Sequence, residues 1–500
     1  MKAKLHLVLS FSIFLTCFSA WGQEYWQYQR TSISSPQFRS GESTQLFGLD
    51  DKAFRQAFDQ LDQGNKTLWF PDATGKVKAF TMEERSVMHP DLQAKYPNIR
   101  SLVGYSADQN TRIRLTISPD KVALMIRQKG ERDAFLEKEG DSYRLYGRGS
   151  RAGEKDFLCS TPEQRSTFEA SRLVDDQTLR TYRLAVSTTG EYTEYHGGTA
   201  AGALAAINTT VSRINEVFSS DLGVQLELIP NNDLLIFTNA TSDPYSNSLN
   251  AEVQATLEDI VGEAAFDVGH LFHREPDNGN AGGIGTVCTD GIKGAAFSSA
   301  LVPEGDRYDL DYVSHELGHQ FGANHTWSFQ SEGTGVQAEP GSGTTIMGYA
   351  GITGANDVES AGDEYYHHNS INQITQYLAT TSCGTTTALT NQPPTITPMP
   401  NYQIPVGTAF VLEGEATDPD GTGSLSYCWE QIDNGVVTNG TFGPNNSQGA
   451  AFRSLRPVAE PFRYFPRLSR IVSGDLTQTS PATGSAWETV PMWHGHTILP

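Results

Sequence analysis

Alternation between polar and apolar positions marks the first third of the chain. Residues 111–117, Thr-Arg-Ile-Arg-Leu-Thr-Ile, change polarity at almost every step, which is typical of a half-buried strand. Residues 122–126 and 143–146 predict further strands, and residues 50–61 predict a short amphipathic helix. The pattern therefore indicates a β-rich N-terminal region.

The middle of the chain switches between the strand period and the helix period. The pattern predicts strands at residues 182–187, 224–229 and 267–272, and helices at residues 199–218 and 253–263. Such alternation is typical of an α/β layer structure. Further on, apolar residues recur at spacings of three and four, which predicts a helix with a buried stripe. They are Leu310, Val313, Leu317 and Phe321.

Towards the C-terminus the pattern becomes short and broken. Residues 391–398 are rich in Pro and Thr and indicate a linker, which we place at 385–398. Strand-like runs separated by turns follow, at residues 410–412, 416–421 and 425–429. They resemble an immunoglobulin-like or cadherin-like sandwich at residues 399–500, a fold that needs about 100 residues and about seven strands. Residues 492–500 lack the pattern of a closing strand, so we expect the sandwich to be incomplete.

The first 22 residues have the pattern of a signal peptide. A short basic start is followed by an apolar run over residues 5–18, and Ala20 and Gly22 are the small residues that a signal peptidase reads. We expect cleavage before Gln23. The run is too short to span a membrane comfortably, and no later segment is long enough. We therefore expect a secreted, soluble, extracellular protein without membrane insertion.

The charge balance bears on partners. The chain has 36 Lys and Arg against 58 Asp and Glu, a net charge of −22, which argues against a nucleic-acid partner. Acidic residues gather at 356–359 and 363–364. They suit calcium (Ca2+), but a solvated acidic loop is the favoured interpretation. We expect a monomer.

Residues 315–325, His-Glu-Leu-Gly-His-Gln-Phe-Gly-Ala-Asn-His, predict a metal site. On a helix, His315 and His319 project from one face and can bind the same ion. Gly322 allows the chain to turn, so that His325 becomes a third ligand. Three imidazoles leave the fourth position of zinc (Zn2+) open for water, and Glu316 beside the first ligand can act as general base on that water.

This motif resembles that of the metzincin metallopeptidases, which also place a methionine in a tight turn beneath the metal. Met347, in the Gly-rich segment 343–350, is the candidate. Residues 181–186, 311–314 and 324–327 resemble secreted bacterial reprolysin-like (adamalysin-related) peptidases. The resemblance covers about residues 175–384 and implies a zinc peptidase domain with a mixed twisted sheet and long helices.

The resemblance has further implications. It makes residues 23–174 a propeptide, with a separate binding module as the alternative. It makes residues 281–288 an edge strand that pairs with protein or peptide substrates in extended form. Tyr349, two residues after Met347, is more like the astacin and serralysin turn. It is a candidate oxyanion hydrogen-bond donor, with simple packing in the turn as the alternative.

Four cysteines remain after signal removal: Cys159, Cys288, Cys383 and Cys428. In an exported protein we expect pairing, and the resemblance to adamalysin-like domains implies a Cys288–Cys383 disulfide. Cys159 is a candidate latency ligand that fills the open zinc position. A buried apolar cysteine and a bridge to Cys428 are the alternatives. Cleavage after Arg172 or Arg180 would then release the inhibitor.

Two functions follow from these observations. The first is a zinc metalloendopeptidase, in which Glu316 activates the zinc-bound water that attacks the peptide carbonyl. The second is a non-catalytic extracellular adhesin with an inert metal domain. An inert domain has no need of Glu316 between the ligands, so the peptidase is favoured.

Overall fold

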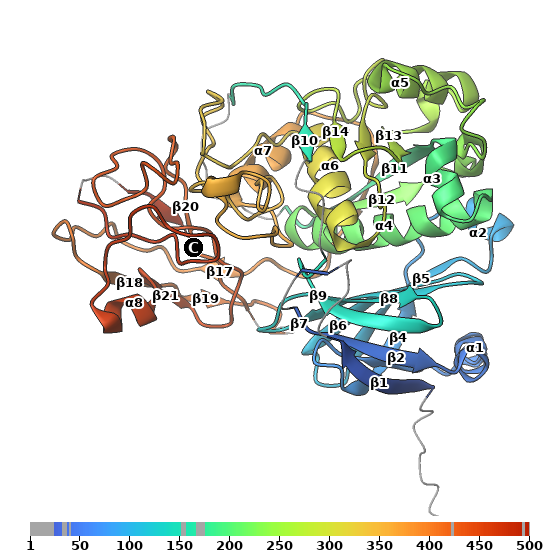
Figure 1. The fold of residues 1–500 in the computed structure, drawn as a ribbon, viewed down its shortest axis with the longest axis horizontal. Coiled ribbons are helices and arrows are strands. Elements are labelled where there is room, and N and C mark those ends of the chain that lie inside the picture. The colour runs from blue at the N-terminus through green and yellow to red at the C-terminus, as the bar shows by residue number, and fades with distance from the viewer. Residues whose placement is uncertain are drawn as a thin grey trace, which may run out of the picture.

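The computed structural model describes residues 25–32, 38–39, 42–151, 157–166, 176–421, 425–492 and 496–499. The predicted signal peptide at residues 1–22 and the predicted cleavage position Arg172 lie outside the described residues. Three regions follow one another along the chain: an N-terminal sheet, a central α/β region and a C-terminal region of short strands (Figure 1). None of the described helices has both the length and the hydropathy needed to cross a membrane.

The N-terminal region is one antiparallel sheet of nine strands, in the order β1-β2-β9-β8-β7-β6-β5-β4-β3. This agrees with the expected β-rich region, and the predicted short helix corresponds to α1. The elements are β1 (Trp26–Ser32), β2 (Thr44–Leu49), α1 (Asp51–Asp59), η1 (Leu61–Gln63), β3 (Thr67–Pro71), β4 (Val77–Glu84), α2 (Pro90–Lys95), β5 (Arg100–Ser106), β6 (Thr111–Ile117), β7 (Val122–Gln128), β8 (Ala134–Glu139) and β9 (Ser142–Gly147).

Strand β6 shows how this sheet is held. Ile113 and Leu115 pack into the sheet's own apolar core, as the alternation predicts. The opposite face is also buried: the guanidinium of Arg114 donates to Glu216 in α4 of the central region at 2.6 Å. The prediction of a half-buried strand is therefore wrong, because the polar face of β6 packs against a helix instead of water. Figure 1 shows α4 lying along this sheet.

The central region is a seven-stranded sheet in the order β10-β14-β15-β13-β11-β12, with β16 also paired to β11. Strands β12, β11, β13 and β15 are parallel, and β14 is antiparallel to β15. The predicted strands and helices of this region are present. The elements are β10 (Leu158–Cys159), β11 (Thr178–Thr188), α3 (Gly190–Tyr195), α4 (Ala200–Asp221), β12 (Val224–Leu228), η2 (Asn232–Leu235), α5 (Leu249–Ile260), η3 (Glu263–Ala265), β13 (Val268–His273), β14 (Asn278–Asn280), β15 (Phe297–Ser299), η4 (Arg307–Val313), α6 (Ser314–Gln320), η5 (Gly354–Asn356), α7 (His368–Leu378) and β16 (Thr385–Ala388).

The strand expected at residues 281–288 lies earlier in the chain. Strand β14 covers Asn278–Asn280, whereas residues 281–288 form turns. Gly282, Gly285 and Cys288 adopt positive φ there, which interrupts an extended strand. The amides of Gly285 and Thr286 instead donate to the last carbonyls of α6, at 2.9 and 2.8 Å. The prediction of a strand at 281–288 is wrong because this segment caps the helix that carries the metal motif.

The C-terminal region has little regular structure among its described residues. Its strands form three separate two-stranded pairs, so the expected immunoglobulin-like sandwich is not confirmed. Residues 498–499, expected to lack strand structure, pair with residues 430–431. The elements are β17 (Thr395–Ile396), β18 (Phe410–Glu413), β19 (Ala416–Thr417), β20 (Glu430–Gln431), β21 (Phe462–Phe465), α8 (Leu468–Ser473) and β22 (Ile498–Leu499).

The C-terminal region also shares a core with the central region. Trp487 and Phe442 pack with Val358, which belongs to the central region. Arg453 binds Glu359 at 2.6 Å and Arg456 binds Asp363 at 2.5 Å. Of the acidic residues considered for calcium, Glu359, Asp363 and Glu364 are therefore paired with arginines, and Asp357 accepts hydrogen bonds from Gly351 and Thr353. None of them belongs to the clusters of possible metal ligands found among the described residues.

Candidate metal centre

The metal motif lies on two joined helical segments. Arg307–Val313 form a π-helical turn, η4, and Ser314–Gln320 continue as α6 (Figure 1). Gly322 then adopts φ of +113°, and the amide of Ala323 donates to the carbonyl of Gly318 at 2.9 Å. This left-handed residue ends the helix, as the sequence predicts, and turns the chain so that His325 faces back towards α6.

The structure brings the three predicted ligands together. Nε2 of His325 lies 3.2 Å from Nε2 of His315 and 3.2 Å from Nε2 of His319. All three side chains are buried. Two nitrogens bound to one tetrahedral zinc, each at about 2.0–2.1 Å, lie about 3.3 Å apart. The separations therefore fit three ligands of a single zinc ion.

The opposite ring nitrogens fix how these imidazoles can act. Nδ1 of His315 lies 2.8 Å from the carbonyl of Ile346, and Nδ1 of His319 lies 2.8 Å from the carbonyl of Ala323. A carbonyl only accepts, so each Nδ1 carries the proton and each Nε2 presents a lone pair. Nδ1 of His325 faces a carboxylate instead, Glu332, at 3.1 Å. Each ring is thereby oriented for metal binding.

Glu316 points into the same space. It is buried, and its Oε2 accepts a hydrogen bond from the Thr161 hydroxyl at 2.8 Å. Its Oε1 has no hydrogen-bond partner among the described residues. Burial raises the pKa of this carboxyl to about 7, and the Thr161 hydrogen bond opposes that shift. Gly279 of β14 gives the carboxylate room, because a Cβ there would lie 2.3 Å from Oε1.

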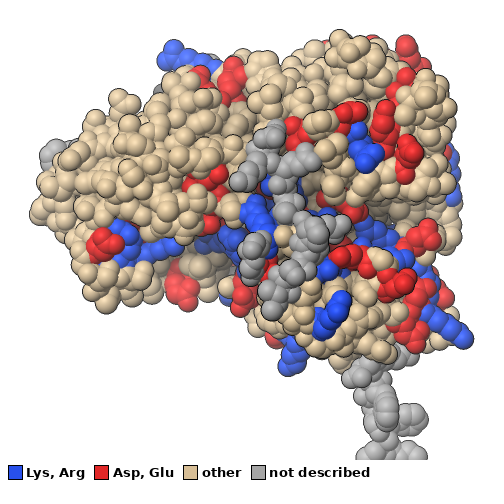
Figure 2. All heavy atoms as spheres, viewed as in Figure 1, with Lys and Arg blue, Asp and Glu red and all other residues tan. Residues whose placement is uncertain are grey.

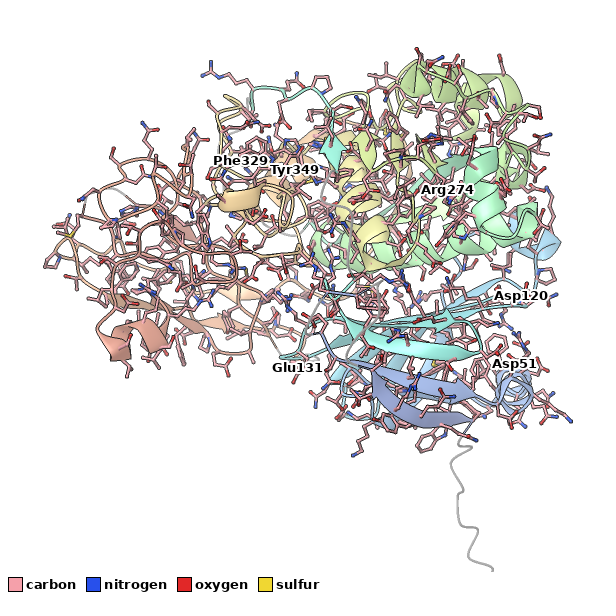
Figure 3. All side chains as sticks on the ribbon, viewed as in Figure 1. Asp51, Asp120, Glu131, Arg274, Phe329 and Tyr349 are labelled. Carbon is pink, nitrogen blue, oxygen red and sulfur yellow. A yellow bond between two sulfur atoms is a disulfide. The ribbon has the colours of Figure 1, made fainter. Side chains whose placement is uncertain are left out.

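Met347 packs against α6, and Tyr349 lies beside His315 and His325. Met347 is fully buried, and a Cβ at Gly318 would lie 2.6 Å from its sulfur, so the turn packs directly under α6. The ring of Tyr349 is centred 4.7 Å from that of His325 and stands beside Phe329, with centroids 6.3 Å apart (Figure 3). Burial raises the pKa of Tyr349. The phenol is therefore near the centre, and its role as donor or packing residue stays a prediction.

Cys159 is the fourth ligand-type side chain at this centre. Its Sγ lies 3.4 Å from Nε2 of His319, and the ligand atoms of Cys159 and the three histidines all lie within 4.8 Å of one another. A sulfur and a nitrogen on one tetrahedral zinc would be about 3.5 Å apart. Cys159 and Cys428 are both free, so the alternative of a bridge between them is not observed. Burial raises the pKa of the Cys159 thiol to about 11.

The segment 157–166 that carries Cys159 runs along strand β14. Strand β10 pairs with β14 in the parallel sense, with Cys159 opposite Gly279. The amide of Ser160 donates to the carbonyl of Gly279 at 2.8 Å, and the amide of Ala281 donates to the Thr161 hydroxyl at 2.7 Å. Figure 1 shows β10 beside β14 and α6. A short extended segment of the N-terminal region thus adds a strand to this side of the central sheet.

Two carboxylates at the centre, Glu163 and Glu332, are not indicated by the sequence pattern. Glu163 lies 2.5 Å from Nδ1 of His325, on the same nitrogen that faces Glu332. Neither carboxylate belongs to a periodic pattern or a fixed spacing from the motif. Glu163 lies only four residues after Cys159 in the sequence, but its position at the metal centre follows from the fold, which extends segment 157–166 over that centre.

The remaining predicted features can be placed as well. Cys288 and Cys383 form the predicted disulfide, with Cα atoms 5.6 Å apart. His270 is buried, and its two ring nitrogens lie 3.0 Å from the Gln320 side chain and 2.9 Å from the Ser298 hydroxyl, which gives it a structural role. Arg180 lies inside β11, where its neighbours in the sheet are β12 and β16. Cleavage after Arg180 would cut a central strand, so the structure disfavours that position.

Comparison with known proteins bears on residues 178–378, which match the family Reprolysin_4, "Metallo-peptidase family M12B Reprolysin-like". Comparison with curated proteins gave no match. Among solved structures, the crystal structure of metalloproteinase-II from Bacteroides fragilis is similar over 62% of this chain and 90% of its own, with 10% identity and a TM-score of 0.35. The family match includes the three histidines, Glu316 and Met347.

Proposed function

Because residues 178–378 form a reprolysin-like metallopeptidase domain, we propose that this protein is a secreted, zinc-dependent endopeptidase whose N-terminal region holds it latent. The observation that carries the proposal is the convergence of three imidazoles beside the carboxylate of Glu316, with Nε2 of His325 3.2 Å from Nε2 of His315 and 3.2 Å from Nε2 of His319. Export rests on the signal-peptide pattern of residues 1–22. N-terminal sequencing of the exported protein tests it, and an intact Met1 would contradict it.

The residues of the chain divide the chemistry among them. Zinc, when bound, would supply a Lewis acid that acidifies water and polarises the substrate carbonyl. Strand β14 offers backbone groups to an extended substrate. Glu316 takes the proton of the attacking water and returns it to the leaving amine. Tyr349, beside His325, is placed to donate a hydrogen bond to the oxyanion.

Hydrolysis of casein by the processed protein tests this function. We expect activity that a chelator removes and added zinc restores. Glu316→Gln should keep zinc and lower hydrolysis by about 10²–10⁴-fold, because it removes a general base without removing a ligand. Glu258→Gln, an exposed carboxylate on α5, is the matched control and should behave as the parent. A zinc-loaded, folded protein that cleaves nothing would favour the alternative, a non-catalytic adhesin.

Latency is proposed to come from Cys159. Its sulfur stands where the fourth zinc ligand belongs, and the Thr161 hydroxyl at the same time donates a hydrogen bond to the carboxylate of Glu316. Segment 157–166 therefore covers both the open coordination position and the general base. Arg172 is the remaining candidate for the activating cut, which would place the mature start near Leu173. Mass spectrometry of the active species would establish that start, and a start within β11 would contradict it.

A further inference from the structure

We propose that Tyr312 is the floor of the principal specificity pocket and selects a flat aromatic side chain within two residues of the scissile bond. Phe157 fills this pocket in the precursor. The inference rests on the proposed peptidase function and adds the substrate class to it: extended peptides that carry Phe, Tyr or Trp next to the cut.

Phe157 lies on Tyr312 as a stacked ring. The two ring centroids are 4.1 Å apart and the planes differ by 7°. The edge of the same phenyl ring faces His315, with centroids 6.0 Å apart and planes at 85°. Phe157 is only 6% exposed. The N-terminal region therefore places an aromatic side chain between a tyrosine face and a predicted zinc ligand.

The tyrosine platform is fixed independently of Phe157. The Tyr312 hydroxyl donates to Asp277 Oδ2 at 2.5 Å and accepts from Arg307 Nε at 2.8 Å. Tyr312 also belongs to the π-helical turn η4, a kind of irregularity that is frequent at functional sites. Because its backbone and its hydroxyl are both anchored in the catalytic domain, the ring face stays in place when Phe157 leaves. A preformed platform costs a substrate little ordering free energy.

The register connects this pocket to the chemistry. In an extended segment, alternate side chains share a face, so Phe157 and Cys159 point into the cleft while Leu158 points outward and is 61% exposed. The sulfur of Cys159 stands at the fourth ligand position of the metal centre, two residues from Phe157. A substrate strand on the same edge, β14, therefore offers the pocket a side chain no more than two residues from its reacting carbonyl.

Ring stacking distinguishes this pocket from one that is only apolar. A pocket that recognises only apolar area accepts a cyclohexyl group as well as a phenyl group. Stacked aromatic pairs are favoured beyond their buried area, which corresponds to a preference of about 2- to 12-fold. The discriminating comparison is therefore phenylalanine against cyclohexylalanine at one position of a peptide.

The test uses the processed, zinc-loaded enzyme and a set of quenched fluorescent peptides. Each peptide carries Phe, cyclohexylalanine or Ala at one position within two residues of the cut. We expect one position at which kcat/KM is highest for Phe, a few-fold above cyclohexylalanine and further above Ala. Tyr312→Phe keeps the ring and should keep this ratio, whereas Tyr312→Leu should reduce the ratio of Phe to cyclohexylalanine to about one. Equal rates for Phe and cyclohexylalanine at every position would overturn the inference.

A second measurement separates this inference from the proposed function. A synthetic peptide with the sequence of residues 157–166, with Ser in place of Cys159, is titrated into the same enzyme and its binding is measured by calorimetry. Replacing its Phe157 by cyclohexylalanine should weaken binding a few-fold with the parent and not with Tyr312→Leu. This result is expected even if no peptide is hydrolysed, so failure of the peptidase function and failure of the platform are distinguishable. If Tyr312→Leu does not fold, the two peptides on the parent enzyme still decide.

Discussion

The N-terminal region contacts the central region in two places, and the two sets of contacts differ in chemistry. At the metal centre, segment 157–166 adds one short strand and offers single groups to Glu316 and the histidines. Away from it, the sheet meets the central region through ion pairs, several of which are buried. These include Arg148–Asp306 at 3.1 Å, Arg114–Glu216 at 2.6 Å, Arg213–Glu137 at 2.8 Å and Lys121–Glu304 at 2.9 Å. Figure 2 shows acidic and basic side chains interspersed over the N-terminal sheet and its junction with the central region.

The difference teaches that inhibition and attachment are separate tasks. The contact at the centre resembles what a substrate makes: backbone pairing, a pocket side chain and a ligand for the metal. The ion-pair interface contains no group of the metal centre, and its charges are matched inside the protein, where an unpaired charge is costly. Loss of one contact should therefore leave the other largely intact, and the following variants are chosen to break each in turn.

The largest effect is expected from Cys159→Ala in the uncut, full-length precursor. Removing the thiol opens the fourth ligand position while the sheet interface stays in place. We expect peptidase activity of the precursor to rise by on the order of 10²-fold, because one of several linked contacts is lost. Cys428→Ala, which removes the other free thiol, should leave the precursor silent. A Cys159→Ala precursor as silent as its parent would show that inhibition does not depend on the thiol.

Arg148→Met should break the interface and leave the centre closed. Arg148 and Asp306 are each 1% exposed, so the variant leaves a buried carboxylate without its main partner. We expect the free energy of unfolding of the full-length chain to fall by about 3–5 kcal/mol. Arg132→Met is the matched control, because Arg132 is 48% exposed and its pair with Asp363 should contribute at most about 1 kcal/mol. Urea unfolding measures both, and equal losses would contradict the contrast between the two contacts.

The smallest effect is expected from Glu163→Gln in the precursor. This change weakens the second carboxylate contact to Nδ1 of His325, while Glu332 still holds the ring. We expect a chelator to extract zinc from the precursor a few-fold faster, since partners behind a ligand tune its affinity. Gln164→Ala alters an exposed neighbour and should not change the rate. An unchanged rate in Glu163→Gln would mean that Glu332 alone orients His325.

Much of the centre could be predicted because its chemistry is local in sequence. Helix periodicity predicts the relative positions of His315, Glu316 and His319, and Gly322 predicts the turn that leads to His325. The π-helical turn before α6 could not be predicted, because one turn of apolar spacing suits an α-helix and a π-helix alike. Phe157 and Glu163 reach the centre only because β10 pairs with β14, and that pairing is not evident from the sequence.

The N-terminal and C-terminal regions show the same limit. Strand β6 can be predicted from its alternating polar and apolar residues. The burial of its polar face depends on α4, which lies more than 80 residues further along the chain. The runs at 410–412 and 416–421 have strand character, but the first pairs with Phe462–Phe465 and the second with Thr395–Ile396, and neither partner is evident from the pattern. Alternation predicts which residues share a face of a strand, but it does not predict which other strand pairs with it.

The most direct test of the central claim, that the N-terminal region closes a zinc peptidase centre with Cys159, is zinc-edge X-ray absorption on the full-length precursor. The account predicts a first shell of three nitrogen atoms at about 2.0–2.1 Å and one sulfur atom at about 2.3 Å, with the sulfur absent from Cys159→Ala. A shell without sulfur in the parent precursor, or one that keeps its sulfur in Cys159→Ala, would contradict it.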